Sequence, residues 1–568
     1  MSRQNLQYLL VPDAGAARRL RRILAEQSAR SGMVVGTWSE LMEWACRAYL
    51  VPETTDDNDS GFRNALEELE DAFWTESLSV APVETSEAVK SALIKIVSAT
   101  DPTSDIEIAG LEGLPERPRR HLDDLFRLAK LLEGRWPQEL SKMQSVRSAD
   151  ANDALHTIRV YRSEGNPRLT RWQTELLEKL NQDADNSEER QDKALPQILN
   201  EVLGSDFAGE PGSSLRVLQE RLFEAVTDKG EVDTSVQWVG TRDFLQEAEV
   251  AAGMVQTMLS ETPDLEPADI GLLIPDSFEY ATALEDACAL GGIALSGLPA
   301  ERWRRDLGRE VVFHFLYCRQ KPAPAMALAI CLSSPLMPWS REEGAVLAQT
   351  VMDGDYRLRP LSSTSRDGRY MLDLLRDGDS EPASLAKALP ELVSLLRGGE
   401  DLVGHIQQAK AAIEQLNDAL EGAASVDWAG LRRTVSPRFI TSGESPDFNL
   451  EGVTVWRESQ EGWRTVKRLI VLGFAQGCYP SALASDPVFS ADDLGSIREL
   501  IGLAVSSPSE ALEDRRLRFK RQLGAVAESV TFLVPRRDAR GERQSPSESL
   551  VFMHQLFSGP DSADERIV

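Results

Sequence analysis

Short apolar runs alternate with amphipathic segments near the start of the chain. The runs Gln7 to Val11 and Met33 to Thr37 each precede a segment with helical periodicity, and Asp13 stands where it can cap the first of these helices. A strand followed by a helix, twice in succession, predicts parallel winding of the α/β type.

The same alternation returns in the second half. Strands are predicted at Val236, Ile270–Ile274, Gly452–Val455, Arg468–Gly473 and Val530–Val534, whereas the stretch from Leu307 to Asn417 reads as mainly helical. We therefore predict two α/β domains with helix-rich insertions. The first covers residues 1–230, the second covers 231–306 with 450–568, and a helical insertion covers 307–449.

Composition and charge narrow the function classes. The 568 residues carry a formal net charge of −29, which argues against a protein that coats nucleic acid non-specifically but leaves room for a local basic channel. No apolar run approaches the roughly 20 residues that span a bilayer. We expect a soluble, cytoplasmic protein with no membrane partner.

Cysteine and histidine are scattered along the chain. No two cysteines form a C-x-x-C pair, and the histidines form no metal-ligand pattern. A metal or iron–sulfur cluster is the alternative, but reduced, mostly buried thiols are the favoured interpretation. No metal or other cofactor is predicted. The cysteines are Cys46, Cys288, Cys318, Cys331 and Cys478.

The chain contains no phosphate-binding loop. The pattern Gly-x-x-x-x-Gly-Lys-Ser/Thr is missing, and so is any Gly-Lys dipeptide. Such a loop holds nucleotide phosphates with backbone N–H groups and one lysine. Ordinary P-loop ATP hydrolysis is therefore not expected.

Four segments together resemble the superfamily 1 helicase-like subunits of bacterial break-processing complexes, the AddB and RecC type. They are LLVPDAGAARRLRRIL with VVGTWSELMEWACRAY; IEIAGLEGLPERPRRHLDDLFRLA; WVGTRDFLQEAEVAAGMV with IGLLIPDSFEYATALEDACALGGIALS; and GVTVWRESQEGWRTVKRLIVLGFAQGCYP with EALEDRRLRFKRQLGAVAESVTFLVPRRDARGERQSPSESL. The similarity touches most of the chain, and its last third is the most specific part.

The chain departs from working helicases of this kind at every nucleotide-handling position. Where motif II carries Asp-Glu for magnesium, the sequence has Ala109-Gly110, with Glu112 displaced along the turn. Where motif VI carries Thr-Arg, whose arginine stabilises the γ-phosphate, it has Leu523-Gly524. The place of motif V is held by Arg457, Ser459, Gly462 and Trp463.

The resemblance therefore implies two RecA-like domains of UvrD-like architecture with a degenerate ATP site. It implies a catalytically inactive subunit that binds or guides DNA, as a single strand or at duplex ends, during double-strand break repair by recombination. The partner would be a UvrD-like or AddA-type helicase–nuclease subunit that supplies ATP hydrolysis and cleavage. No catalytic residue is predicted in this chain.

Two alternatives stay open. AddB-type proteins continue into a nuclease domain, so the chain could be the N-terminal part of an ATP-dependent nuclease subunit. It could also be a structural adaptor without DNA contact, for example in phage defence, which the acidic charge permits.

Basic and aromatic residues in the last third are the candidate DNA contacts. Arginines and lysines would track the phosphate backbone, and the two tryptophans would stack on bases. The alternative is a solvated helix on which Glu510, Glu513 and Asp514 pair with the arginines. The candidates are Arg515, Arg516, Arg518, Lys520, Arg521, Arg536, Arg537, Trp456 and Trp463.

Asp243 and Glu247 look like a catalytic pair but lie one turn apart at the start of a predicted helix. At that position, carboxylates interact favourably with the positive end of the helix dipole. We expect this structural role for both.

Overall fold

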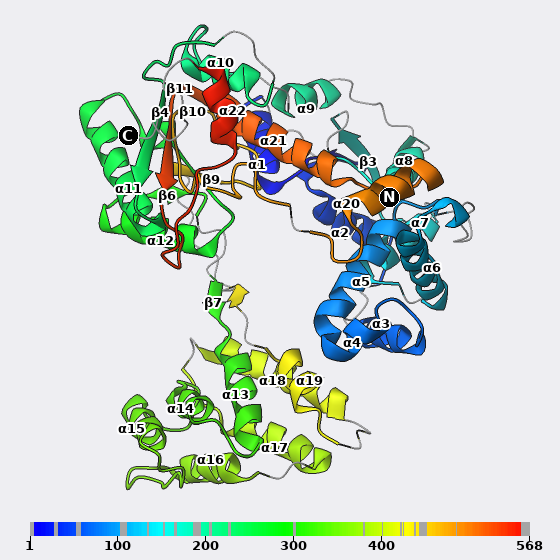
Figure 1. Ribbon diagram of the computed structural model, residues 1–568, viewed down its shortest axis with the longest axis vertical. Coiled ribbons are helices and arrows are strands. Elements are labelled where there is room, and N and C mark those ends of the chain that lie inside the picture. The colour runs from blue at the N-terminus through cyan, green and yellow to red at the C-terminus, as the bar shows by residue number, and fades with distance from the viewer. Residues whose placement is uncertain are drawn as a thin grey trace. The chain divides into compact units, whose positions relative to one another are not determined.

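Two parallel β-sheets form the framework of the chain in a computed structural model (Figure 1). The chain divides into two units, Met1–Pro299 with Phe448–Val568, and Ala300–Asp447. The predicted α/β fold class is confirmed. The structure describes residues 5–27, 32–52, 58–102, 111–132, 136–150, 154–163, 167–185, 195–203, 207–224, 229–298, 303–378, 381–399, 402–420, 423, 425–436, 439–441, 451–483 and 485–557.

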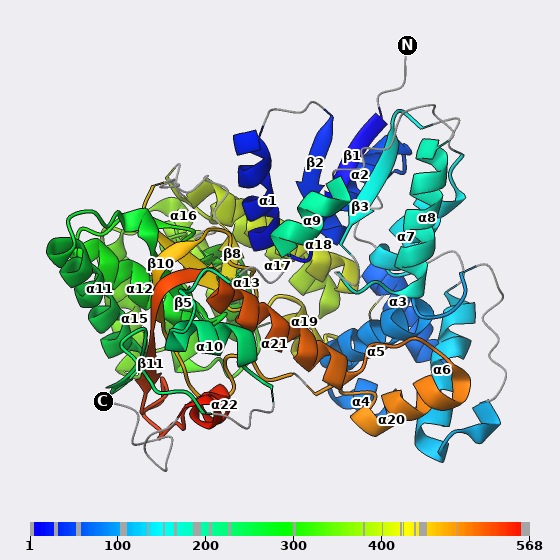
Figure 2. The same cartoon turned by 90° about the horizontal axis from the view of Figure 1, so that it is seen from above.

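The first sheet has three strands in the order β2-β1-β3, all parallel. The strands are β1 (Asn5–Leu10), β2 (Met33–Gly36) and β3 (Thr157–Arg162). Figure 2 shows them side by side. Strand β3 was not among the predicted strands, although Ile158 and Val160 alternate there in the manner of a strand and both are buried.

Helices cover both faces of this sheet. One face packs on α1 (Ala14–Gln27) and α9 (Leu195–Leu203), and the other packs on α2, α7 and α8 within a large helical core. Asp13 caps α1 as predicted, because its Oδ1 accepts the Ala16 N–H at 3.0 Å. The remaining helices of this region are α2 (Trp38–Ala48), α3 (Asn58–Glu68), α4 (Thr75–Val80), α5 (Pro82–Val97), α6 (Glu116–Leu131), α7 (Gln138–Ser148) and α8 (Arg171–Asp185), with a 3₁₀ turn, η1 (Leu111–Gly113).

The second sheet has six parallel strands in the order β4-β11-β10-β5-β9-β6. Its central strand β5, IGLLI, is a continuous run of apolar residues and glycine, as expected where helices cover both faces of a parallel sheet. Strand β5 is buried over its whole length. The strands are β4 (Val236–Thr241), β5 (Ile270–Ile274), β6 (Leu295–Ser296), β9 (Val453–Arg457), β10 (Val466–Val471) and β11 (Val526–Pro535).

This sheet is the middle of three layers. One face carries α11 (Phe244–Glu261) and α12 (Phe278–Leu290), and the other carries α10 (Ser214–Arg221), α21 (Pro508–Gly524) and α22 (Ser549–Leu556) (Figure 1). A 3₁₀ turn, η2 (Pro267–Asp269), leads into β5. Helix α10 therefore packs with the second sheet, although it precedes the predicted boundary at residue 230.

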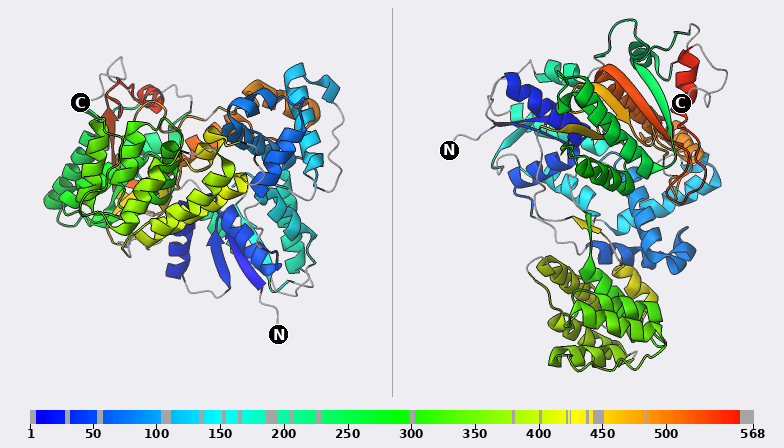
Figure 3. Two further views of the ribbon diagram at one scale, coloured as in Figure 1. Left: turned by 90° about the horizontal axis from the view of Figure 1, so that it is seen from below. Right: turned by 90° about the vertical axis from the view of Figure 1, so that its left-hand side faces the viewer.

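The unit Ala300–Asp447 is mainly helical. Its helices gather in one body around their own apolar core (Figure 3). They are α13 (Leu307–Arg319), α14 (Ala325–Ser333), α15 (Arg341–Met352), α16 (Arg366–Arg376), α17 (Pro382–Leu395), α18 (Val403–Leu420) and α19 (Trp428–Thr434), with an antiparallel pair of short strands, β7 (Trp303–Arg305) and β8 (Phe439–Thr441).

The segment around α20 (Ala491–Ser496) and the following π-helical turn, η4 (Ile497–Ile501), packs with the N-terminal helices rather than with the second sheet. Val488 and Phe489 belong to the N-terminal core, and Arg117 pairs with Asp493 at 2.9 Å. The predicted assignment of this segment to the second domain therefore differs from the packing.

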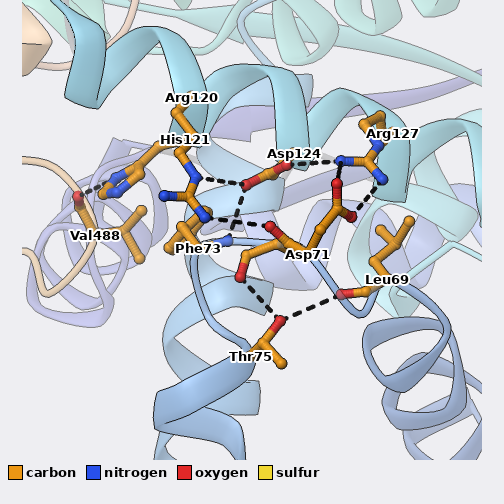
Figure 4. Close-up of polar contacts among 10 residues, drawn as sticks. Leu69, Asp71, Phe73, Thr75, Arg120, His121, Asp124, Arg127 and Val488 are labelled. Carbon is orange, nitrogen blue, oxygen red and sulfur yellow. Dashed lines mark hydrogen bonds and ion pairs between the residues drawn. The ribbon is translucent and has the colours of Figure 1, made fainter.

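Helix α6 contacts that segment through His121, and it holds the turn before α4 through Asp124 (Figure 4). The His121 ring stacks on Phe73 with centroids 4.0 Å apart, and its Nδ1 lies 3.1 Å from the Val488 carbonyl oxygen. The buried Asp124 carboxylate accepts the Phe73 N–H at 2.9 Å and pairs with Arg127 at 3.0 Å. Burial lowers the pKa of His121, so a neutral ring is favoured in this anchoring role.

The strands predicted in the second half of the chain agree with the observed strands, because their apolar runs are distinct in the sequence. Ile270–Ile274 is a strand with those bounds, and the other expected runs in the second half fall on β4, β9, β10 and β11. The strand compared with helicase motif II, predicted at residues 106–109, lies outside the described residues. No helix among the described residues combines the length and apolar character needed to cross a bilayer.

Candidate nucleic-acid interface

Loops that bind ligands in parallel α/β sheets lie beyond the carboxyl ends of the strands. In the six-stranded sheet, β4 ends at Thr241 and β11 ends beside it at Pro535. The chain then continues into Arg242 on one strand and into Arg536 and Arg537 on the other. Two of the predicted DNA contacts thus lie at the edge where a ligand is expected.

Residues 536–543 form a tight hairpin at this edge. Arg537 and Arg543 make an antiparallel bridge, and the Gln544 N–H donates to the Arg536 carbonyl at 3.0 Å. Gly541 closes the turn at φ +80°, a backbone conformation that favours glycine. Four arginines of the hairpin are exposed: Arg536, Arg537, Arg540 and Arg543.

The supposed catalytic pair at the start of α11 is structural. Asp243 caps the helix, accepting the Gln246 N–H at 3.0 Å, as expected for a carboxylate at this end. Glu247 is fully buried; it accepts the Gly473 N–H at 3.0 Å and the Tyr280 hydroxyl at 2.5 Å. Burial raises the pKa of Glu247 to about 8. This side chain joins α11, α12 and the turn after β10, and a substrate has no access to it.

A second buried carboxylate organises the turn after β10. Glu458 accepts the Tyr479 N–H at 2.9 Å and also the Ser481 N–H. Burial raises its pKa to about 6. Arg515 of α21 donates to the Ser481 and Ala482 carbonyls at 2.8 Å each, so this predicted DNA contact is occupied by the protein's own backbone.

The other basic residues of α21 also contact groups of the protein itself. Lys520 pairs with Glu224 at 2.7 Å, and Arg521 pairs with Glu461 at 2.7 Å. The Arg518 Nε lies 3.8 Å from Asp13 Oδ2, and Arg516 lies over the ring of Phe223. The basic run is therefore neither a free DNA surface nor a solvated helix face.

The carboxylates predicted to pair with these arginines pair with other arginines. Glu510 pairs with Arg498 at 2.7 Å, and Asp514 pairs with Arg168 at 3.0 Å. Glu513 lies 3.5 Å from Arg168. These carboxylates belong to the first turns of α21, whereas the arginines that follow face the core and the first sheet. The pairing expected from sequence proximity is therefore wrong.

The prediction that Trp456 and Trp463 stack on bases is wrong, because both side chains are buried. Trp456 is 0% exposed and Trp463 is 5% exposed, and both belong to the core on the α21 side of the sheet. Trp463 donates its indole N–H to the Val455 carbonyl at 3.3 Å, and Arg18 lies 3.7 Å over its ring. Bases cannot reach either ring in this conformation.

A buried polar cluster joins the first βα turn to the loop between β9 and β10. Asp13 Oδ1 accepts the Glu461 N–H at 3.1 Å in addition to capping α1. A Cβ added at Gly15 would lie 2.3 Å from the Glu461 carbonyl oxygen, so only glycine permits this approach. Burial raises the pKa of both carboxylic acids, that of Glu461 to about 7.

Sequence reasoning missed this cluster because its members are far apart in the chain. Asp13 was assigned a local capping role, and Glu461 was not singled out. The glycine directly before a run of good helix formers, Gly15, was the only local signal of a close backbone approach.

No metal centre is indicated in the part of the chain that the structure describes. No group of three or more histidine, cysteine, aspartate or glutamate side chains there is placed to hold a metal ion. All five cysteines are free thiols.

No family model matches the chain, and no curated protein is significantly similar to it.

Proposed function

We propose that this chain is a catalytically inactive, helicase-like subunit that binds or guides DNA in a helicase–nuclease complex for double-strand break repair. The two parallel sheets would correspond to the two RecA-like domains of a UvrD-like helicase. A UvrD-like or AddA-type partner would supply ATP hydrolysis and cleavage.

The main support for this proposal is the turn between β1 and α1, which has no room for a phosphate group. The N-terminus of a helix in such a turn attracts phosphate through its free N–H groups and its dipole. Here the Asp13 carboxylate accepts from Ala16 at that position, and the Glu461 backbone approaches Gly15 too closely to leave room for a ligand. The turn is thus filled by the protein's own carboxylate and backbone.

The arginines of α21 support the same proposal. In a working motor of this kind, the arginine of motif VI stabilises the charge on the transferred phosphate, and the matching place in this chain is Leu523-Gly524. The arginines that precede this place contact carboxylates: Arg521 pairs with Glu461, and Arg518 faces Asp13. Carboxylates of the protein therefore occupy guanidinium groups that would otherwise attract phosphate, and they join the two sheets without a nucleotide.

The test combines the full chain with its candidate helicase. We expect no binding of magnesium–ATP by the chain alone in equilibrium dialysis. We also expect a stable complex with the helicase by size-exclusion chromatography and a changed rate of DNA unwinding. Tight ATP binding by the isolated chain, or the absence of both complex and effect, would overturn the proposal.

A structural adaptor without DNA contact is the second candidate. The net charge of −29 and the internal pairing of the α21 cations favour it. Binding to forked or single-stranded DNA at low salt discriminates between the two, because phosphate contacts strengthen steeply as salt falls. Lack of binding at low salt would support the adaptor.

A further inference from the structure

The hairpin of residues 536–543 carries cations that differ from those of α21. Arg536, Arg540 and Arg543 are exposed, and within the described residues their side chains make no ion pair or hydrogen bond. The Arg537 guanidinium braces the turn by donating to the Gly541 carbonyl at 2.7 Å. Among the described residues, three guanidinium groups without an ion pair or hydrogen bond therefore lie on this one hairpin.

Acidic neighbours on the hairpin do not neutralise these arginines. The hairpin has two carboxylates, Asp538 and Glu542, against its four arginines. Asp538 Oδ1 is already occupied, since it accepts the backbone N–H groups of Arg540 at 2.9 Å and of Glu542 at 2.8 Å. The hairpin therefore has a local positive charge, although the net charge of the chain is −29.

The base of the hairpin is fixed to the sheet. The Arg536 N–H donates to the Thr241 carbonyl of β4 at 3.0 Å, and the Gln476 N–H donates to the Ser545 carbonyl at 2.8 Å. Ser547 donates to the Cys478 carbonyl at 2.7 Å just beyond the hairpin. The arginines are thus presented from a rigid base, which reduces the entropy that binding would cost.

Arginine suits one class of ligand at such a position. Its planar guanidinium donates two parallel hydrogen bonds to a phosphate group, which a lysine ammonium cannot do. No aromatic residue occurs among residues 536–543, so the hairpin offers no surface on which bases could stack. Recognition here would depend on the phosphates and not on the base sequence.

We propose that Arg536, Arg540 and Arg543, on the hairpin braced by Arg537, bind the phosphodiester backbone of a nucleic acid independently of sequence. This inference rests on the proposed function and deepens it, because it places the contact on the hairpin and not on α21. The adjacent Arg242, which follows β4, pairs with Asp243 at 2.8 Å and is therefore not part of the proposed contact.

The experiment measures binding of a fluorescein-labelled oligothymidylate, and of a labelled duplex, to the full chain by fluorescence anisotropy over a salt series. The test variant is R536E/R540E/R543E. The matched control is R359E/R366E/R369E in the helical unit, because these arginines are also exposed and have no ion pair among the described residues. Both variants change the net charge equally.

We expect the hairpin variant to bind the single strand at least about tenfold more weakly and to reduce the salt slope by about 2, since each phosphate contact contributes roughly 0.7 for single strands. The control should remain near wild type. R536K/R540K/R543K should retain part of the affinity, because it keeps the charge and loses only the bidentate geometry. A greater loss with the duplex than with the single strand would assign the hairpin to duplex DNA.

Each contrary outcome has its own meaning. Wild-type binding that is unchanged in the hairpin variant would overturn this inference and leave the proposed function standing. An equal loss in the control variant would show a non-specific effect of charge and would also overturn the inference. Absence of any binding by the wild type at low salt would overturn the DNA role itself.

Discussion

Helix α21 and the hairpin of residues 536–543 are both rich in arginine, yet the structure uses their charges differently. On α21, Arg521 is 11% exposed and pairs with Glu461, while Arg515 is bonded to two backbone carbonyls. On the hairpin, Arg540 and Arg543 are exposed and have no ion pair within the described residues. A basic run in a sequence is thus a nucleic-acid site only where the fold leaves its guanidinium groups accessible.

The physical basis of this difference is burial. An arginine that leaves water must be paired, because an isolated buried charge is very costly. Helix α21 lies between the second sheet and the first βα turn, so its cations meet Asp13 and Glu461. The hairpin extends beyond the sheet edge, where water solvates each guanidinium and no partner is required. Substitutions should therefore affect stability on the helix and binding on the hairpin.

The largest effect is expected for Arg521→Ala. Above about pH 7, where the Glu461 carboxyl is ionised, the substitution removes the ion-pair partner of this 6% exposed side chain, and breaking a buried pair costs about 3–5 kcal/mol. Urea unfolding followed by circular dichroism measures the loss. The double variant R521M/E461Q should recover much of the stability, since no uncompensated charge remains. A loss below about 1 kcal/mol for R521A would show that the pair is not buried as described.

Gly15→Ala should be the next most damaging change. The added Cβ would lie 2.3 Å from the Glu461 carbonyl oxygen, and such overpacking costs about 1–3 kcal/mol. Gly253→Ala is the matched control, because Gly253 is also within a helix but has no neighbour within 4 Å. There alanine should stabilise the protein by about 0.5–1 kcal/mol. Equal effects of the two substitutions would contradict the close approach of the first βα turn to the β9–β10 loop.

The pH dependence of stability should report the same cluster. Burial raises the pKa of Glu461 from 4.5 to about 7, although Arg521, Arg518 and Arg19 oppose the shift and Asp13 adds to it. A raised pKa means that the folded state binds the proton more tightly. Its stabilisation is therefore complete below the unfolded pKa and is lost as the pH rises through about 7.

The free energy of unfolding should accordingly fall between about pH 4.5 and 7, by at most about 1.4 kcal/mol per pH unit for this one group. Glu461→Gln removes the titrating group and should flatten that part of the profile. Because Glu247 and Glu458 also have raised pKa values, the informative quantity is the difference between wild type and variant. Superimposable profiles would exclude Glu461 as the group responsible.

The smallest effect on stability is expected from the hairpin. Arg540→Ala removes an exposed side chain without a partner among the described residues, so the free energy of unfolding should stay within about 0.5 kcal/mol of wild type. Thermal melting of this variant beside R521A gives the comparison directly. A clear destabilisation by R540A would show that the hairpin arginines are structural, like those of α21.

Most helices and strands, and the α/β class, follow from local sequence patterns. The buried run Ile270–Ile274 and the helix capped by Asp13 were predicted because hydrophobic period and capping chemistry act between residues that are close in the chain. Strand β3 was not predicted although its pattern alternates. The pattern would also have given one of its faces to solvent, whereas Arg159 is buried and pairs with Asp185 at 2.7 Å.

Which charged groups are paired depends on contacts between distant parts of the chain. Asp13 and Arg518 lie in different regions of the chain, as do Gly15 and Glu461, and no periodicity links them. The same holds for Trp456, which the sequence offers as an exposed stacking surface and the fold buries between helix and sheet. Hydrophobic pattern specifies the face of an element, but the partner of a buried charge is specified by which distant element packs against that face.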